Sequence, residues 1–330
     1  VTTFIEGRML SYLKYDSALL ESGIKQNAKF LKWQWPMFML GPVVGAILYL
    51  IIISFVKDSK EHRELNLKAA QDGIVLLQNK DSYLPLDKNI QKKIAVVGPN
   101  SMSVTALEGN YNAYASEYIT VADGMRRVFK DSHITVEKGT NYCLEKENDW
   151  GGFGNLISDG IAAASQADIT VLALGLDCSI EGEDTGYDND YTACGDKKYV
   201  TLPATQQKLA EAVCDECENV IVVLMCGSSI DVGEKVRSKA KAIIHAWYPG
   251  STGGLAIANL IAGEYSPSGK LPITIYDEKH DLPSFLDYNM QGKTYRYIDG
   301  DALYPFGYGL SYTSFEYSNA KLLENAEDVV

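Results

Sequence analysis

ADITVLALG, residues 167–175, is the stretch that decides the fold. After Asp168 it is apolar and partly β-branched, and a polar, acidic loop follows it directly. A short continuous apolar run bounded by turn residues is typical of a strand that is buried on both faces. Strands of this kind belong to parallel sheets that are covered by helices on both sides.

Segments of the same kind alternate with helix-like segments along the chain. The strand-like segments are Lys93–Gly98, His133–Glu137, Ala167–Gly175, Asn219–Cys226, Lys241–Trp247 and Leu271–Tyr276. Helical spacing of apolar residues is found in Val121–Lys130, Asn155–Ala167, Pro203–Asp215, Ile230–Ser238 and Gly253–Ala262. This order predicts an α/β fold with a six-stranded, mostly parallel sheet sandwiched by helices.

One segment departs from the globular pattern. Met37–Val56 (MFMLGPVVGAILYLIIISFV) is a run of 20 residues without a charge, about the length that a membrane-spanning helix needs. Trp33 and Trp35 stand at its entrance, where interfacial aromatic side chains are common. We therefore expect a transmembrane helix at 37–56, preceded by an N-terminal tail at 1–36. A buried core helix is the alternative, although core helices are seldom apolar all round over this length.

The acidic loop is the first candidate for a functional site. Gly175–Asp196 reads GLDCSIEGEDTGYDNDYTACGD. In a parallel α/β sheet, catalytic groups gather at the carboxyl ends of the strands, and carboxylates there are candidates for acid–base chemistry. A solvated acidic loop or a loose cation site is the alternative reading. The loop holds the acidic residues Glu181, Glu183, Asp184, Asp188, Asp190 and Asp196 after Asp177.

Cysteines bracket this loop and form one further pair. Cys178 and Cys194 have 15 residues between them, and in an oxidising compartment a disulfide between them would staple the loop. Two separate thiols are the alternative, because pairing cannot be deduced from sequence. Cys214 and Cys217 form a lone C-x-x-C, without the second pair of ligands that a zinc site needs.

Other patterns exclude whole classes of protein. The formal net charge of −13 argues against a nucleic-acid-binding protein, which needs a basic face. The chain contains neither the nucleotide-binding patterns G-x-G-x-x-G and G-x-x-x-x-G-K-[ST] nor the hydrolase pattern G-x-S-x-G. Its four histidines show no metal-ligand spacing. We expect no metal and no organic cofactor.

Three longer stretches carry a family resemblance. They are Ala69–Leu86 (AAQDGIVLLQNKDSYLPL), Trp247–Ile275 (WYPGSTGGLAIANLIAGEYSPSGKLPITI) and Thr294–Phe315 (TYRYIDGDALYPFGYGLSYTSF). In this order they resemble the C-terminal domain of family 3 glycoside hydrolases, the β-glucosidase and β-xylosidase group. The resemblance implies an α/β sandwich domain at 57–315. A linker or the start of a fibronectin-type domain would follow at 316–330.

The resemblance also implies a division of catalytic labour. In this family the sandwich domain supplies the general acid/base glutamate, and a separate (β/α)₈ barrel supplies the aspartate nucleophile. By this resemblance the acid/base residue is Glu183, with Glu181 as the alternative, because the arginine that ends the family's Glu-Gly-x-Asp-Arg pattern is missing here. Lys197 or Lys198 is expected to replace its charge. With an anchor ahead of the domain, the barrel is expected downstream or on a separate chain.

These patterns together predict a membrane-anchored component of a retaining β-glycosidase. It would hydrolyse β-linked gluco- or xylo-oligosaccharides, and this fragment alone would be inactive. The expected partners are the oligosaccharide, the barrel domain and the membrane, through 37–56, but no nucleic acid. The domain is expected outside the cell on a single-pass anchor. The alternative is a non-catalytic carbohydrate-binding or scaffold module with the same fold.

Overall fold

The computed structural model describes most of the chain from residue 59 onward. The described residues are 43–48, 59–143 except 111, 156–181, 191–193, 196–280 and, from 283 to 319, all but 285, 299, 301, 315 and 317. The chain divides into two units, Val1–Lys60 and Glu61–Val330.

The first unit is described at 59–60 and at 43–48, a short helix whose Val43, Val44, Ile47 and Leu48 side chains are exposed. In the part of the chain that the structure describes, no helix has the length and apolar character needed to cross a membrane. The transmembrane helix predicted at 37–56 lies outside the described residues except for 43–48.

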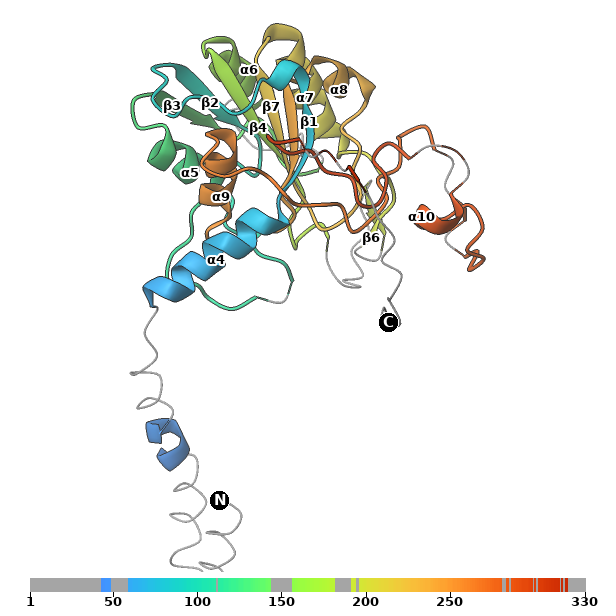
Figure 1. Cartoon of the computed structure of the whole chain (residues 1–330), viewed down its shortest axis with the longest axis horizontal. Coiled ribbons are helices and arrows are strands. Elements are labelled where there is room, and N and C mark those ends of the chain that lie inside the picture. The colour runs from blue at the N-terminus through green and yellow to red at the C-terminus, as the bar shows by residue number, and fades with distance from the viewer. Residues whose placement is uncertain are drawn as a thin grey trace, which may run out of the picture. The chain divides into compact units, whose positions relative to one another are not determined.

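The second unit is built on a six-stranded sheet in the order β1-β8-β7-β4-β2-β3 (Figure 1). The strands are β1 (Val75–Asn79), β2 (Lys93–Val97), β3 (His133–Glu137), β4 (Ile169–Gly175), β7 (Val220–Met225) and β8 (Ala242–His245). All neighbouring pairs are parallel except β1 and β8, which pair antiparallel at one edge. A small hairpin of β5 (Thr192–Ala193) and β6 (Asp196–Lys197) is separate from this sheet.

The predicted sheet is confirmed in five of its strands and wrong in the sixth. Leu271–Tyr276 was expected in the sheet, but there Ile275 makes an isolated bridge to Tyr304. Pro272 removes a backbone donor that a ladder would need. The sixth strand is β1, and an antiparallel edge strand on an otherwise parallel sheet is a common arrangement.

Helices cover both faces of the sheet, as Figure 1 shows. The two apolar cores alternate along each strand, because successive side chains point to opposite faces. Val171 and Val223 pack with α5 (Val121–Val128) and α9 (Gly253–Ile261), whereas Leu172 and Val222 face the opposite layer. That layer consists of α6 (Leu156–Ser165), α7 (Ala204–Glu216) and α8 (Glu234–Lys239).

Shorter elements complete the unit. α4 (Lys60–Gly73) leads into β1, and α10 (Thr294–Tyr297) lies in the C-terminal segment. Two 3₁₀ turns, Lys80–Ser82 and Thr105–Leu107, follow β1 and β2. With both faces of the sheet buried, polar groups that need a ligand or solvent are confined to its ends and edges.

Helices α5 and α9 touch through their backbones. A Cβ added at Gly124 would lie 2.0 Å from the Gly254 carbonyl oxygen, and one added at Gly254 would lie 1.9 Å from that of Thr120. Neither carbonyl can move without breaking its helix or cap, since Thr120 caps α5 with Asp123. Only glycine fits at this crossing.

We expect Gly124→Ala to destabilise the domain by about 1–3 kcal/mol or more, because the added methyl overpacks a backbone contact. Gly73→Ala is the matched control: it lies at the end of α4 with no atom within 4 Å of its Cβ position. Chemical denaturation of both variants measures the difference. Equal stabilities for the two would contradict the close crossing.

Candidate active site at the carboxyl ends of the sheet

The chain leaves β4 in a tight turn that fixes Glu181. The backbone amides of Ile180 and Glu181 donate to the carbonyl oxygen of Asp177, at 3.0 and 2.8 Å. The buried Asp177 carboxylate accepts hydrogen bonds from Thr105 Oγ1 at 2.8 Å and from the Ser179 amide at 2.9 Å. The first turn of the acidic loop is therefore held by the backbone carbonyl and the side chain of Asp177.

Glu181 joins the ends of three neighbouring strands. Its Oε2 accepts a hydrogen bond from the Gly227 amide at 2.8 Å and another from the Tyr248 hydroxyl, while Oε1 accepts one from Ser228 Oγ. Gly227 and Ser228 follow β7, and Tyr248 follows β8. We call these four residues the Glu181 clamp. It bridges β4, β7 and β8 at their carboxyl ends.

The clamp is electrostatically matched to a carboxylate. Burial, with the nearby charge of Glu181 as the second cause, raises the pKa of Tyr248 far above its ordinary value. The phenol therefore remains a hydrogen-bond donor at any physiological pH. Hydrogen bonds from neutral donors to an ionised carboxylate are shorter and stronger than those between two neutral groups.

The far end of the acidic loop is tied to the same place. Lys197 on β6 donates through Nζ to the Ser229 carbonyl oxygen, and Tyr191 donates through its hydroxyl to the Thr201 carbonyl oxygen at 2.7 Å. Burial lowers the pKa of Lys197, and the nearby Cys226 and Glu181 side chains oppose this shift. The two ends of the loop, at Glu181 and Lys197, thus both bind within Gly227–Ser229.

The predicted site residues fall into two groups. Glu181 is in the clamp and Lys197 lies close enough to sense its charge, whereas Lys198 is exposed. Glu183 lies outside the described residues. So do Asp184, Asp188 and Asp190, and Asp196 is on β6.

The cysteine prediction has a partial answer. Cys178 is a free thiol, so the structure does not contain the proposed disulfide, and Cys194 lies outside the described residues. Burial raises the pKa of Cys178. Cys214 is packed in the core on α7, and burial raises the pKa of its thiol to about 12.

Sequence reasoning did not assign Gly227, Ser228 or Tyr248 to the site. Gly227 and Ser228 stand in CGSSID, which fails the hydrolase pattern, and Tyr248 stands in a turn. Each nevertheless follows a predicted strand, and in a parallel sheet such positions meet at one edge. That positional signal could have identified them.

A neutral histidine lies beneath the clamp. His245, at the end of β8, is fully buried, and burial lowers its pKa to about 3, with the nearby positive charge of Lys197 as the second cause. Its Nδ1 is 4.0 Å from Cys226 Sγ, and the Trp247 ring meets its ring edge-on at 4.0 Å between centroids. The imidazole is a neutral packing group.

An aromatic hollow of about 680 Å³ opens beside the clamp. Its walls are Gly227, Ser228 and Ser229 after β7, Pro272–Thr274 and Tyr276, and Met290 with Thr294–Tyr297 from the C-terminal segment. The Tyr276 hydroxyl accepts a hydrogen bond from the Thr294 amide at 2.9 Å. Several apolar rings with a few polar groups are the usual lining of a small-molecule site.

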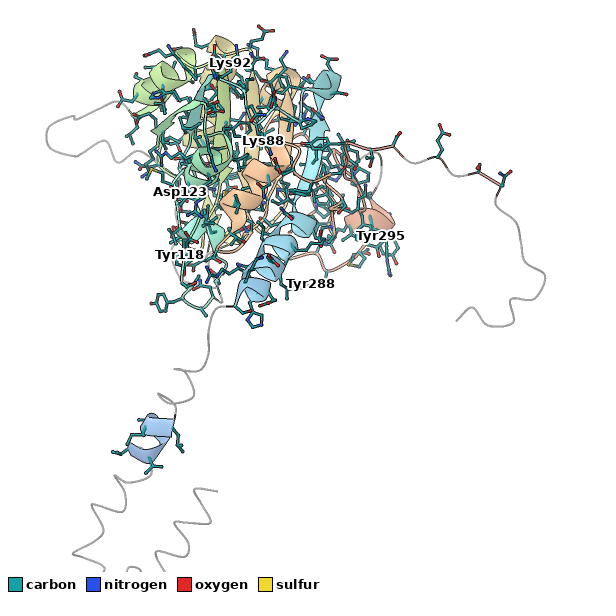
Figure 2. The ribbon with its side chains drawn as sticks, turned by 60° about the vertical axis from the view of Figure 1, so that its left-hand side comes forward. Lys88, Lys92, Tyr118, Asp123, Tyr288 and Tyr295 are labelled. Carbon is teal, nitrogen blue, oxygen red and sulfur yellow. The ribbon has the colours of Figure 1, made fainter. Side chains whose placement is uncertain are left out.

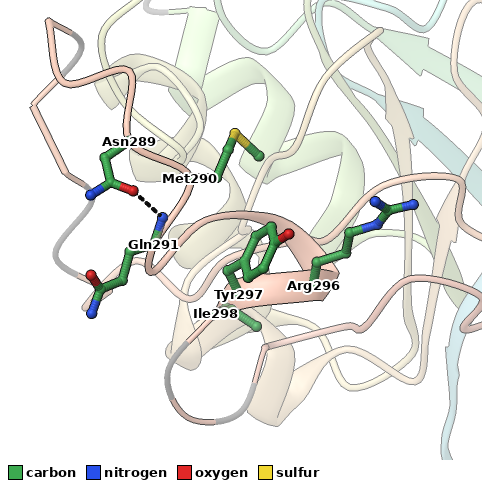
Figure 3. A pocket seen from close by; sticks show the side chains of 6 residues that line it. All are labelled: Asn289, Met290, Gln291, Arg296, Tyr297 and Ile298. Carbon is green, nitrogen blue, oxygen red and sulfur yellow. Dashed lines mark hydrogen bonds between the residues drawn. The ribbon is translucent and has the colours of Figure 1, made fainter.

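A second hollow, of about 560 Å³, adjoins the first (Figure 3). The two share Met290, Arg296 and Tyr297, so α10 forms a wall between them. Tyr288 and Tyr295 of the same segment lie at the surface (Figure 2), 87% and 51% exposed. This end of the sheet presents aromatic rings to whatever binds there.

Comparison with known proteins gives a consistent result. Residues 74–312 match the sequence model of the glycosyl hydrolase family 3 C-terminal domain. β-D-xylosidase 1 from Arabidopsis thaliana is 40% identical over 269 residues, which are 79% of this chain and 32% of that protein. Xylan 1,4-β-xylosidase from Xylanibacter ruminicola is 43% identical over 148 residues, 45% of this chain and 17% of that protein.

Solved structures agree. A family 3 exo-β-xylosidase in complex with a xylobiose aziridine probe is 30% identical, with a TM-score of 0.63 over 75% of this chain and 31% of that one. A family 3 β-glucosidase from Bifidobacterium adolescentis is 29% identical, with a TM-score of 0.63 over 79% of this chain and 37% of that one. The chain spans about a third of the length of the relatives it matches.

Acid should destabilise the domain through His245. Its folded pKa of about 3 lies below the ordinary value of 6.5, so its stabilising contribution is present above pH 6.5 and is lost as the pH falls towards 3. We expect the unfolding free energy of the wild type to fall by about 1 kcal/mol more per pH unit below 6.5 than that of His245→Gln. Denaturant titrations at pH 4–7 measure both slopes, and parallel slopes would contradict the buried neutral imidazole.

Proposed function

We infer the function of this chain from its family: it belongs to glycosyl hydrolase family 3, of which it carries the C-terminal domain. The relatives that it matches are glycoside hydrolases, among them β-xylosidases and β-glucosidases. We propose that this domain is one half of the active site of a retaining β-glycosidase, acting on β-linked xylo- or gluco-oligosaccharides.

We propose Glu183 as the general acid/base. The observation that carries this assignment is the state of its neighbour: both carboxylate oxygens of Glu181 are occupied by donors from Gly227, Ser228 and Tyr248. A general acid must instead present a proton to the leaving oxygen of the substrate. In the sequence Glu183 follows Glu181 after one glycine, and Glu181 itself lies at the carboxyl ends of the strands, where catalytic groups gather.

The chemistry needs a second carboxylate on a partner barrel. In the first step the partner's aspartate attacks the anomeric carbon while Glu183 gives its proton to the departing oxygen, and a glycosyl–enzyme bond forms. In the second step Glu183 takes a proton from water, whose oxygen displaces the aspartate. A separation of ~5–5.5 Å between the two carboxyl groups is required for net retention.

We also propose that residues 37–56 anchor the protein in the cell membrane with the domain outside. The uncharged run of 20 residues supports this, as do the exposed Val43, Val44, Ile47 and Leu48 side chains of the helix at 43–48. In water such a contiguous apolar surface is unfavourable, whereas lipid covers it at no cost.

A non-catalytic carbohydrate-binding module is the second candidate. The aromatic hollow favours it, because Tyr276, Tyr295 and Tyr297 line a cavity large enough for a sugar unit. The two candidates differ in whether the acidic loop does chemistry once the barrel is present.

The catalytic proposal predicts a dependence on the leaving group. Glu183→Gln, in this chain joined to its barrel, should lower turnover of alkyl β-xylosides by about 10²–10⁴-fold, the usual contribution of general acid catalysis. Substrates with activated aryl leaving groups need no protonation and should lose much less in their first step. Steady-state kinetics on a leaving-group series measure this, and azide should partly restore turnover of the activated substrates.

The isolated chain, which supplies only one of the two carboxylates, should show no measurable turnover. If Glu183→Gln leaves the rate of the joined protein unchanged, the catalytic assignment is wrong. Should the isolated chain then bind xylobiose, with Tyr297→Ala removing the binding in calorimetric titrations, the carbohydrate-binding module is the better description.

Protease added to intact cells should digest the domain after Lys57, because the anchor exposes it outside. Permeabilised cells provide the positive control. If the domain is protected until the cells are permeabilised, the proposed orientation is wrong. If an alkaline carbonate wash releases the uncleaved protein from the membrane, the proposed anchor is wrong.

A further inference from the structure

The clamp on Glu181 is more elaborate than the fold needs. Three donors from two different strand ends converge on one side chain, although Cys226 and Ile230, on either side of Gly227–Ser229 in the sequence, are already packed in the apolar core. A single carboxylate that collects this many charge-assisted hydrogen bonds is held in one position. Its own backbone is also fixed, because Asn110 Nδ2 donates to the Glu181 carbonyl oxygen at 3.0 Å.

The position that is held is the entrance to the acidic loop. Glu181 is the last described residue before 182–190, and Tyr191 is the first one after it. The return of the chain is fixed through the contact of Lys197 with Ser229. The residues before and after the acidic loop, Glu181 and Lys197, therefore both bind to one short segment, Gly227–Ser229. This segment follows the buried strand β7.

We propose that Glu181 is a positioning residue for acid/base catalysis: bound by Gly227, Ser228 and Tyr248, it fixes the point from which the chain presents the acid/base residue. This inference rests on the proposed function. Proton transfer requires the donor within ~3 Å of the leaving oxygen. A misplacement of about 1 Å can cost on the order of 100-fold in rate.

Lys197 belongs to the same device. Burial lowers its pKa, but the nearby negative charge of Glu181 favours its protonated form, in which it donates to Ser229. The same cation balances the clamp's anion across the loop. Lys197 thus supplies the positive charge that the resemblance expects from the missing arginine. It does so beside Glu181, with its ammonium group bound to the Ser229 carbonyl oxygen.

The test uses the chain joined to its barrel and three variants. Glu181→Gln keeps the size of the side chain but turns one acceptor into a donor, which must face the Gly227 amide or a hydroxyl. Tyr248→Phe removes one hydrogen bond and little volume. Glu218→Gln, at an exposed side chain in the turn between α7 and β7, is the matched control for the loss of a carboxylate.

We expect Glu181→Gln to lower kcat/KM for alkyl β-xylosides by about 10–100-fold more than for 2,4-dinitrophenyl β-xyloside. Tyr248→Phe should show the same selectivity with a smaller loss, and the double variant should lose less than the sum of the two, since both act through one contact. Glu218→Gln should match the wild type. Azide should not restore Glu181→Gln, because its acid/base glutamate is still present.

Each other outcome has a definite meaning. Equal losses for all leaving groups would make Glu181 a purely structural residue and overturn the inference. Azide rescue of Glu181→Gln would make Glu181 itself the acid/base and overturn it too. If Glu183→Gln shows no selectivity between leaving groups, the proposed function fails instead. Should Glu181→Gln not fold, as judged by its thermal midpoint, the milder Tyr248→Phe decides alone.

Discussion

Burial of the sheet on both faces is the constraint on which the rest of this structure depends. The central strands β4, β7 and β8 are apolar except for Thr170 and His245, so most of their polar neighbours must lie where the strands end. Because these strands are parallel, their carboxyl ends lie at one edge, and side chains far apart in sequence meet there. The Glu181 clamp and the aromatic hollow both lie at this edge.

The Glu181 clamp fixes the segments that follow these strands relative to one another. A carboxylate at the end of β4 satisfies the amide and hydroxyl groups that follow β7 and β8, and a lysine from the β5–β6 hairpin satisfies a carbonyl of the same segment. His245, buried at the end of β8, is neutral and adds no charge next to the clamp. The acidic loop is thereby carried by rigid strands, which is what a catalytic group requires of its support.

How much of this could be predicted from the sequence depends on the range of the interactions. A strand that is buried on both faces can be recognised from its own sequence, as the apolar run ADITVLALG shows. Five of the six strands were predicted correctly in this way. β1 was missed, because its pairing partner β8 lies far along the chain and nothing local records that contact. The apolar composition of Leu271–Tyr276 is typical of a strand. Whether a segment joins a sheet depends on its pairing partner, however, and here Ile275 pairs with Tyr304 outside the sheet. The partners of Glu181 lie 46 to 67 positions away, beyond the reach of any spacing rule.

The central claim is that Glu181 holds the frame and Glu183 does the chemistry. The most direct measurement is a crystal structure of this chain with its barrel, labelled on the nucleophile by a covalent xyloside inhibitor. The account predicts Glu181 still bound to Gly227, Ser228 and Tyr248, with the Glu183 carboxyl group ~5–5.5 Å from the labelled aspartate. Glu181 released from the clamp and lying at that distance, with Glu183 turned away, would contradict it.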